Sequence, residues 1–240
     1  MKLQQTPQPM NQRGNANMMK YKVVEKFVSI NGEGQASGQL AIFIRFAECN
    51  LDCSYCDTQW ANEESVDYES MTAEEIHKYI KTTGVKNITL TGGEPLIQDG
   101  MLELVTLLCE DENLSIEIET NGSKHINDFT AIKKNPPSIT MDYKLASSSM
   151  EQAMKAENFE YLTKKDTLKF VVGNLFDLER AKQIIETHDL TNRTTVYISP
   201  IFSEIHMDEI VNFMKEHRLN NVTLQMQLHK VIWDPEERGV

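Results

Sequence analysis

The sequence has little cysteine and little positive charge, and it has no long apolar run. Its 240 residues contain 4 cysteines, 2 tryptophans and 7 prolines, and 24 basic residues stand against 36 acidic ones. The net charge of −12 disfavours a protein whose main work is gripping nucleic acid, because such proteins need a basic surface. We therefore predict no direct nucleic-acid partner.

No apolar run approaches the roughly 18 to 20 residues that a membrane-spanning helix needs. Residues 1–20 also lack the apolar segment of a signal peptide. These absences predict no membrane partner and a cytoplasmic location, where thiols stay reduced and bind metals more often than they form disulfides.

The chain divides into an irregular start and a regular remainder. Residues 1–20 are rich in Gln, Asn, Pro and Met, and we expect a disordered N-terminal extension there. Residues 21–240 contain no linker and predict a single domain. Apolar, β-branched runs typical of strands recur at 23–30, 41–46, 87–90, 115–119, 138–141, 168–172, 195–198 and 221–224. From about residue 72 they alternate with segments of helical spacing at 72–83, 99–110, 149–157, 175–187 and 206–216.

Alternating strands and helices predict parallel strands that are joined by helical crossovers. The length of the chain favours an α/β fold with a partial, open (β/α) barrel over a complete barrel of eight units. In barrels of this kind the functional groups lie at the carboxyl ends of the strands.

Three of the four cysteines are clustered in one loop. Cys49, Cys53 and Cys56 lie within eight residues, directly after the strand predicted at 41–46. Thiolates are soft ligands that select zinc, copper(I) or iron–sulfur clusters. Three thiolates would hold three irons of a four-iron cluster and leave the fourth iron open to a small molecule. The alternative is a zinc site completed by His77 or another distant ligand, although no second cysteine pair or histidine pair follows.

Glycines and polar residues follow several later strands. In the segment 91–95, Thr-Gly-Gly-Glu-Pro, the glycines let the backbone approach a ligand closely, and Glu94 could add a charge for an ammonium group. The alternative for the segment 91–95 is a simple turn without a ligand. For the ends of the two strands that follow it in the sequence, the alternative is likewise a turn or a solvated loop. The polar residues that end later strands are Glu119, Asn121, Lys144, Ser147, Lys169 and Ser199.

The cysteine spacing, Cys-x3-Cys-x2-Cys with Tyr55 and Asp57 beside the last cysteine, resembles the cluster motif of the radical S-adenosylmethionine (SAM) enzymes. The Gly-Gly-Glu-Pro turn is similar to the motif that holds the amino group of SAM in that superfamily. The resemblance implies a [4Fe-4S] cluster on the three cysteines, a bound SAM, and no catalytic residue from the protein itself. It implies cofactor contacts from Tyr55, Cys56, Asp57, Gly93, Glu94, Glu119, Asn121, Lys144 and Ser147.

Further segments, from about residue 24 to the C-terminus, resemble the 7-carboxy-7-deazaguanine synthases. They are the stretches at 29–34, 43–46, 56–58, 227–233 and 238–240. This resemblance implies that a 5′-deoxyadenosyl radical takes a hydrogen from C6 of 6-carboxy-5,6,7,8-tetrahydropterin. The ring then contracts with loss of ammonia to 7-carboxy-7-deazaguanine, a step toward queuosine and other 7-deazapurines.

The same resemblance assigns the substrate and metal contacts. Arg45 matches an arginine for the substrate carboxylate, and Thr58 matches a threonine that supplies a Mg2+ ligand. Asn31 stands where the family usually has Gln. The implied substrate contacts are Ile30, Asn31, Gly32, Arg45, Thr91, His229 and the terminal carboxylate of Val240. The family also implies a homodimer and a reductant such as flavodoxin or ferredoxin.

Three alternatives stay open from the sequence. Arg45 could be a surface ion-pair partner and His229 a packed core residue. The chain could be an activating enzyme that installs a glycyl radical on a large partner, although such proteins are not expected to carry the segments at 29–34 and 227–240. It could also be a zinc-binding module without catalysis.

Overall fold

The computed structural model describes residues 19–235 and 237–240. The strands in the described residues are β1 (Tyr21–Ile30), β2 (Leu40–Phe46), β3 (Glu69–Met71), β4 (Asn87–Gly92), β5 (Ser115–Thr120), β6 (Ser138–Tyr143), β7 (Thr167–Val172), β8 (Thr195–Pro200) and β9 (Val222–Leu224). They form one sheet in the order β3-β1-β2-β4-β5-β6-β7-β8-β9. Neighbours from β2 to β9 run parallel, whereas β1 pairs antiparallel with both β2 and β3. The predicted α/β fold with a partial, open barrel is confirmed.

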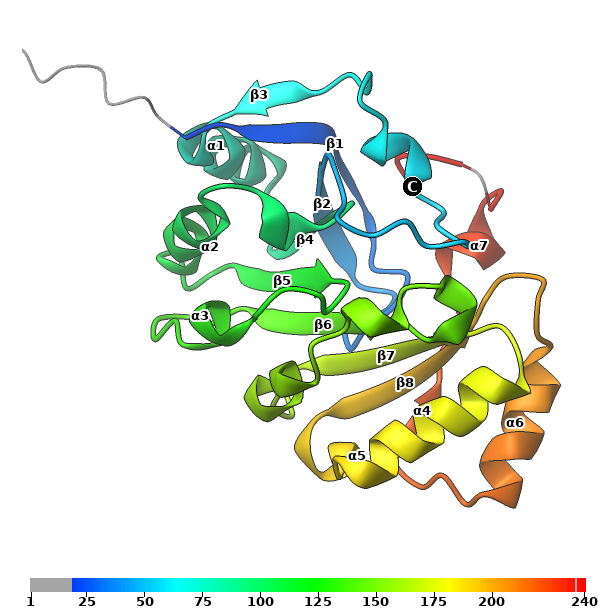
Figure 1. The fold of residues 1–240 in the computed structure, drawn as a ribbon. Coiled ribbons are helices and arrows are strands. Elements are labelled where there is room, and N and C mark those ends of the chain that lie inside the picture. Colours follow the sequence, from blue (N-terminus) through cyan, green and yellow to red (C-terminus); the bar gives the residue numbers. More distant parts are fainter. Residues whose placement is uncertain (1–18, 236) are drawn as a thin grey trace, which may run out of the picture.

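Helices connect most of the parallel strands, and one more helix follows the last strand. They are α1 (Ala73–Thr83), α2 (Met101–Cys109), α3 (Asn127–Thr130), α4 (Leu175–Thr187), α5 (Leu190–Arg193), α6 (Met207–Glu216) and α7 (His229–Ile232). Figure 1 shows most of them along the outside of the curved sheet, with α7 and the C-terminus at the end to which the arrowheads of the parallel strands, such as β5, point. No helix in the described part of the chain is both long enough and apolar enough to cross a membrane.

The two faces of the sheet differ in chemistry because side chains alternate along each strand. On β5, Ile116 and Ile118 are buried in the core cluster that also contains Leu104 of α2. Glu117 and Glu119, between and after them, point to the opposite face. The apolar core therefore lies between the sheet and its helices, and the inside of the partial barrel is polar.

The predicted helix at 149–157 is wrong. The chain forms short 3-10 turns there instead, at Ala146–Ser148, Glu151–Ala153 and Ala156–Tyr161. Ser149 adopts a left-handed conformation with φ of 63°, and Met154 is extended, so neither residue can continue a helix. The side chain of Asn158 then anchors the last turn by donating hydrogen bonds to the carbonyls of Gly122 and Lys124.

The sequence also gave no indication of β3 or of the short helices α3, α5 and α7. These elements have only three or four residues each, too few to show a period. The expected disordered extension at 1–20 lies outside the described residues except for Met19 and Lys20, which precede β1 directly.

The start of α1 provides a test of the local sequence signals. Thr72 Oγ1 accepts a hydrogen bond from Glu75 N at 3.2 Å, and Thr72 N donates one to Glu75 Oε2 at 2.8 Å. We expect Thr72→Ala to lower the free energy of unfolding by about 1 kcal/mol in urea titrations, because the variant loses the side-chain oxygen that caps Glu75 N. The control is Thr106→Ala, an exposed mid-helix threonine, which should change stability by no more than about 0.5 kcal/mol. Equal losses in the two variants would contradict the capping role.

Candidate active site

A cavity of about 900 Å³ opens at the carboxyl ends of the parallel strands. It brings together the cysteine loop, the ends of β2 and β4 to β7, and the C-terminal segment. The predicted site residues that line it are Ile30, Gly32, Arg45, Cys49, Cys53, Tyr55, Cys56, Asp57, Thr58, Thr91, Gly93, Glu119, Asn121, Lys144, His229 and Val240. The predicted site residues that do not line it are Asn31, Glu94 and Ser147.

The cysteine loop is shaped by hydrogen bonds within it and to the end of β5. Cys49 Sγ accepts bonds from Leu51 N at 3.4 Å and from Asn121 Nδ2 at 3.7 Å. The turn closes with a bond from Cys56 N to Cys53 O at 3.1 Å. These contacts hold the three thiols at the wall of the cavity. The N–H donors to Cys49 are of the kind that adjust the reduction potential of an iron–sulfur cluster bound to such a sulfur.

The three thiols fit an iron–sulfur cluster. Burial raises the pKa of Cys53 to about 11 and also raises the pKa of Cys49 and Cys56, so metal binding must displace their protons. Each iron of a cluster takes one cysteine, so the sulfurs need not converge on a point. Within residues 19–235 and 237–240, no three His, Cys, Asp or Glu side chains converge on one metal ion. His77 lies on α1 beside a separate surface hollow, which argues against the zinc alternative.

Glu94 is turned away from the cavity and into the protein. Its fully buried carboxylate accepts hydrogen bonds from Leu96 N at 3.0 Å, Thr120 Oγ1 at 2.8 Å and Asn121 N at 2.7 Å. Burial raises the pKa of Glu94 despite these bonds. The carboxylate thus ties the turn after β4 to the end of β5, and it places Gly93 and Asn121 at the cavity wall.

Asn31 and Ser147 also make internal contacts. Asn31 Oδ1 accepts a hydrogen bond from Thr89 Oγ1 at 2.8 Å, so the shorter amide reaches β4 and not the cavity. Ser147 Oγ accepts a bond from Asn174 Nδ2 at 2.9 Å, and Ser147 O accepts one from Ser54 Oγ at 2.5 Å. Both residues position loops around the site.

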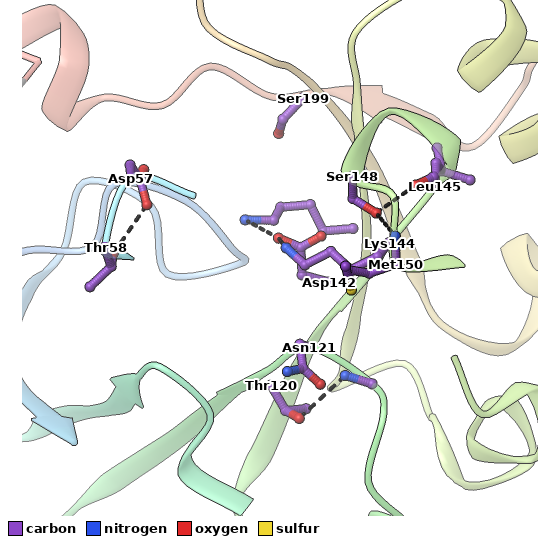
Figure 2. Close-up of polar contacts among 12 residues, drawn as sticks. Asp57, Thr58, Thr120, Asn121, Asp142, Lys144, Leu145, Ser148, Met150 and Ser199 are labelled. Carbon is purple, nitrogen blue, oxygen red and sulfur yellow. Dashed lines mark hydrogen bonds and ion pairs between the residues drawn. The ribbon is translucent and has the colours of Figure 1, made fainter. Parts of the chain in front are cut away.

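A chain of partly buried charges, whose side chains are 12–19% exposed, crosses the inside of the barrel. Lys169 Nζ lies 3.0 Å from Glu33 Oε2 and 3.4 Å from Asp142 Oδ2, and Lys144 Nζ lies 3.0 Å from the same Asp142 oxygen. Although burial opposes it, the two lysines keep the pKa of Asp142 below its usual value. Figure 2 shows Asp142 and Lys144 on one side of the site, with Asp57 and Thr58 facing them from the other.

Two atoms beside this chain have no hydrogen-bond partner among the described residues. They are Asp142 Oδ1 and the hydroxyl of Tyr55, and both are buried. The Lys144 ammonium sits 5.5 Å from the centre of the Tyr55 ring. Buried polar atoms are nearly always satisfied, so these two indicate a polar ligand in the cavity. Asp142 and Glu33 were not among the site residues predicted from the sequence. Asp142 could have been predicted, because it shares a strand face with Lys144 two residues later.

The C-terminal segment covers the opposite side of the cavity. A Cβ at Gly32 would lie 2.4 Å from His229 Nδ1, so the glycine leaves the space that the imidazole fills. Leu228 N donates to Gly32 O at 3.1 Å, which fixes the start of α7 there. Burial lowers the pKa of His229. The imidazole is therefore neutral at pH 7, and it lines the cavity instead of packing in the core.

Two cationic contacts fasten this segment to the cysteine loop. Lys230 Nζ lies 3.2 Å from Asp57 Oδ2, and the Arg238 guanidinium stacks 4.1 Å from the centre of the Trp60 ring. A guanidinium over an indole face is an attractive arrangement. The residues next to Cys56 and the end of the chain therefore form one wall.

Arg45 lines the cavity, and the ion pair that the alternative expected is also present, at the cavity wall and not on the outer surface. Its Nε lies 3.0 Å from Glu25 Oε2, and each side chain is 19% exposed. Because the contact is made through Nε, the two terminal nitrogens can form a bidentate pair with a carboxylate.

Residues 43–165 match the family profile described as Radical SAM superfamily. A solved structure, the crystal structure of QueE from Escherichia coli, has the same fold with a TM-score of 0.69. The match has 24% sequence identity and covers 87% of this chain and 94% of that chain. With the three-cysteine loop at the mouth of a partial barrel, these findings place the chain in the radical SAM superfamily.

The sequence relatives are more specific. A 7-carboxy-7-deazaguanine synthase from Clostridium acetobutylicum is 61% identical over 222 residues, which are 92% of this chain and 100% of the relative. A 7-carboxy-7-deazaguanine synthase from Chlorobaculum tepidum is 32% identical over 91% of this chain and 96% of the relative. The chain belongs to the 7-carboxy-7-deazaguanine synthases, which excludes the activating-enzyme alternative.

Glu117, on β5 next to the cavity-lining Glu119, makes the stability of the fold depend on pH. Burial, with the neighbouring Glu119, raises its pKa from 4.5 to about 7, although Thr140 donates a hydrogen bond to it. Below pH 4.5 the folded and unfolded chains both hold the proton, whereas above pH 7 the folded chain must bury a second carboxylate.

We therefore expect Glu117→Gln to raise the free energy of unfolding at pH 8 by about 1–3 kcal/mol and to leave it nearly unchanged at pH 5. Urea titrations at both pH values measure this difference. The exposed Glu160→Gln serves as control and should show no pH-dependent gain. A gain of Glu117→Gln at pH 5 that vanishes at pH 8 would contradict the proposed burial of a protonated carboxyl.

Proposed function

We propose that the protein converts 6-carboxy-5,6,7,8-tetrahydropterin to 7-carboxy-7-deazaguanine with loss of ammonia. The observation that carries the proposal is that one cavity contains the three cysteines, the backbone of Gly93 and a charged arginine fork at Arg45. When bound, the [4Fe-4S] cluster on Cys49, Cys53 and Cys56 and SAM supply the radical chemistry. The protein supplies position and the exclusion of water.

The substrate would lie between Arg45 and the C-terminal wall. Arg45 pairs with the pterin carboxylate, while Thr91, His229 and the Val240 carboxylate contact the ring from other sides. Ile30 and Gly32 form the adjoining part of the wall. Charge contacts on opposite sides of a flat ring fix it in one orientation, which a radical that must reach a single hydrogen requires.

The SAM molecule would lie between the cysteine loop and the ends of β4 to β6. Gly93 follows β4 and Asn121 follows β5, and Lys144 and Tyr55 line the same cavity. Glu119, on the same wall, has its pKa raised by burial despite the opposing charge of Lys169. In this arrangement Glu94 and Ser147 position the site without lining it.

We propose Thr58 as a Mg2+ ligand together with the substrate carboxylate. Its hydroxyl lines the cavity and donates a hydrogen bond to Asp57 Oδ1 at 3.1 Å. Although burial opposes it, Lys230 keeps the pKa of Asp57 below its usual value, so a carboxylate stands beside the hydroxyl. Hard oxygen donors of this kind suit Mg2+.

The remaining proposals rest on the family resemblance. Residues 21–240 would act as a single domain in the cytoplasm, where the three thiols stay reduced. The working enzyme would be a homodimer, and a flavodoxin or ferredoxin would deliver the electron that the cluster needs.

The direct test is product formation. Anaerobically reconstituted, reduced protein that receives SAM, Mg2+ and 6-carboxytetrahydropterin should yield 7-carboxy-7-deazaguanine, detected by mass spectrometry. Omission of Mg2+ should lower the yield. Protein that cleaves SAM but leaves the pterin unchanged would contradict the proposed substrate.

Arg45→Ala should raise the KM for the pterin about tenfold to a hundredfold, because one charge-assisted pair is lost. Iron content and the Kd for SAM should stay as in the unsubstituted protein. The control is Arg180→Ala, which removes an exposed ion pair with Glu151 on the outside of the barrel. Loss of the cluster in Arg45→Ala would show instead that Arg45 has a structural role.

A further inference from the structure

The 3-10 turn η1 (Gln59–Asn62) joins the cysteine loop to the ends of β2 and β4. Ala61 is fully buried, and Ala61 O accepts a hydrogen bond from Glu48 N at 3.1 Å. Glu48 O in turn accepts a bond from Glu94 N at 2.9 Å. Asn62 therefore directly follows Ala61, which is hydrogen-bonded to Glu48 and, through Glu48, linked to the turn after β4.

This anchoring brings the Asn62 amide against Gly93. A Cβ built at Gly93 would lie 2.4 Å from Asn62 Oδ1 and 2.0 Å from Glu48 O, so only a glycine leaves room for both oxygens. Asn62 and Gly93 both line the cavity. The side of Gly93 that faces the start of the cysteine loop thus presents oxygen acceptors.

Asn62 Oδ1 is buried and has no hydrogen-bond partner among the described residues. The backbone donors of Gly93 and of the next residue are already used, since Gly93 N donates to Phe46 O at 3.1 Å and Glu94 N donates to Glu48 O. A buried acceptor without a donor costs free energy, so its retention indicates a donor that arrives with a ligand.

We propose that Asn62 Oδ1 accepts a hydrogen bond from the α-ammonium group of SAM bound beside Gly93. An ammonium group brings three donors and a positive charge, which suits a pocket of acceptors better than a single neutral N–H does. This inference rests on the proposed function, because it takes SAM as the molecule that occupies this part of the cavity. Asn62 is then a binding residue outside the cysteine and glycine motifs.

The test compares Asn62→Ala, Asn62→Asp and the exposed control Asn192→Ala in cluster-loaded, anaerobic protein. Calorimetric titration gives the Kd for SAM and for a SAM analogue that has hydrogen in place of the amino group. We expect Asn62→Ala to raise the Kd for SAM about tenfold to a hundredfold and to leave the Kd for the analogue unchanged. Asn62→Asp, which keeps the acceptor and adds charge, should bind SAM at least as tightly as the unsubstituted protein.

Iron content and thermal unfolding, measured on the same samples, separate binding from structure. If the amide instead donated its nitrogen to Glu48 O, Asn62→Asp would place two acceptors together and lower the stability and the iron content, which would overturn the inference. An unchanged Kd for SAM in Asn62→Ala would overturn the inference alone and leave the proposed function standing. Unsubstituted protein that binds no SAM would overturn both.

Discussion

Buried charge is the constraint on which this barrel depends. Lys169 reaches Glu33, from the segment after β1, and Asp142, from β6, so it joins the inner ends of elements far apart in the sequence. A buried charge is tolerated only when it is paired, and removal of one partner leaves the others exposed to a low dielectric. The inside of the barrel can therefore stay polar and open to a ligand, while the apolar core lies outside, between sheet and helices.

The rim of the cavity is also held in place by polar contacts between segments that are far apart in the sequence. Hydrogen bonds hold parts of the rim in place: the Glu94 carboxylate accepts from the backbone N–H of Asn121, and the Gly32 carbonyl accepts from Leu228 N at the start of α7. Contacts from Lys230 to Asp57 and from Arg238 to Trp60 join the end of the chain to the cysteine loop. Preorganisation of this kind places groups before the ligand arrives and lowers the cost of binding.

Much of this arrangement could be predicted from the sequence. Apolar, β-branched runs located the parallel strands, and polar residues at strand ends located the cavity wall, because parallel strands end at a common edge. The helix expected at 149–157 failed because Ser149 and Met154 have backbone conformations that helical spacing cannot reveal. Asn62 was missed because it stands in no motif, and its position against Gly93 depends on a turn that only the fold defines.

The sequence by itself determined the class of chemistry, since three clustered thiols restrict the metal and the strand pattern restricts the architecture. Tertiary structure alone decided the direction of each side chain. Glu94 shows why: its motif places it at the cavity edge, yet three donors from its own turn and from the end of β5 draw the carboxylate inward. A local pattern fixes where a residue stands along the chain, whereas the donors that compete for its atoms come from segments that meet only on folding.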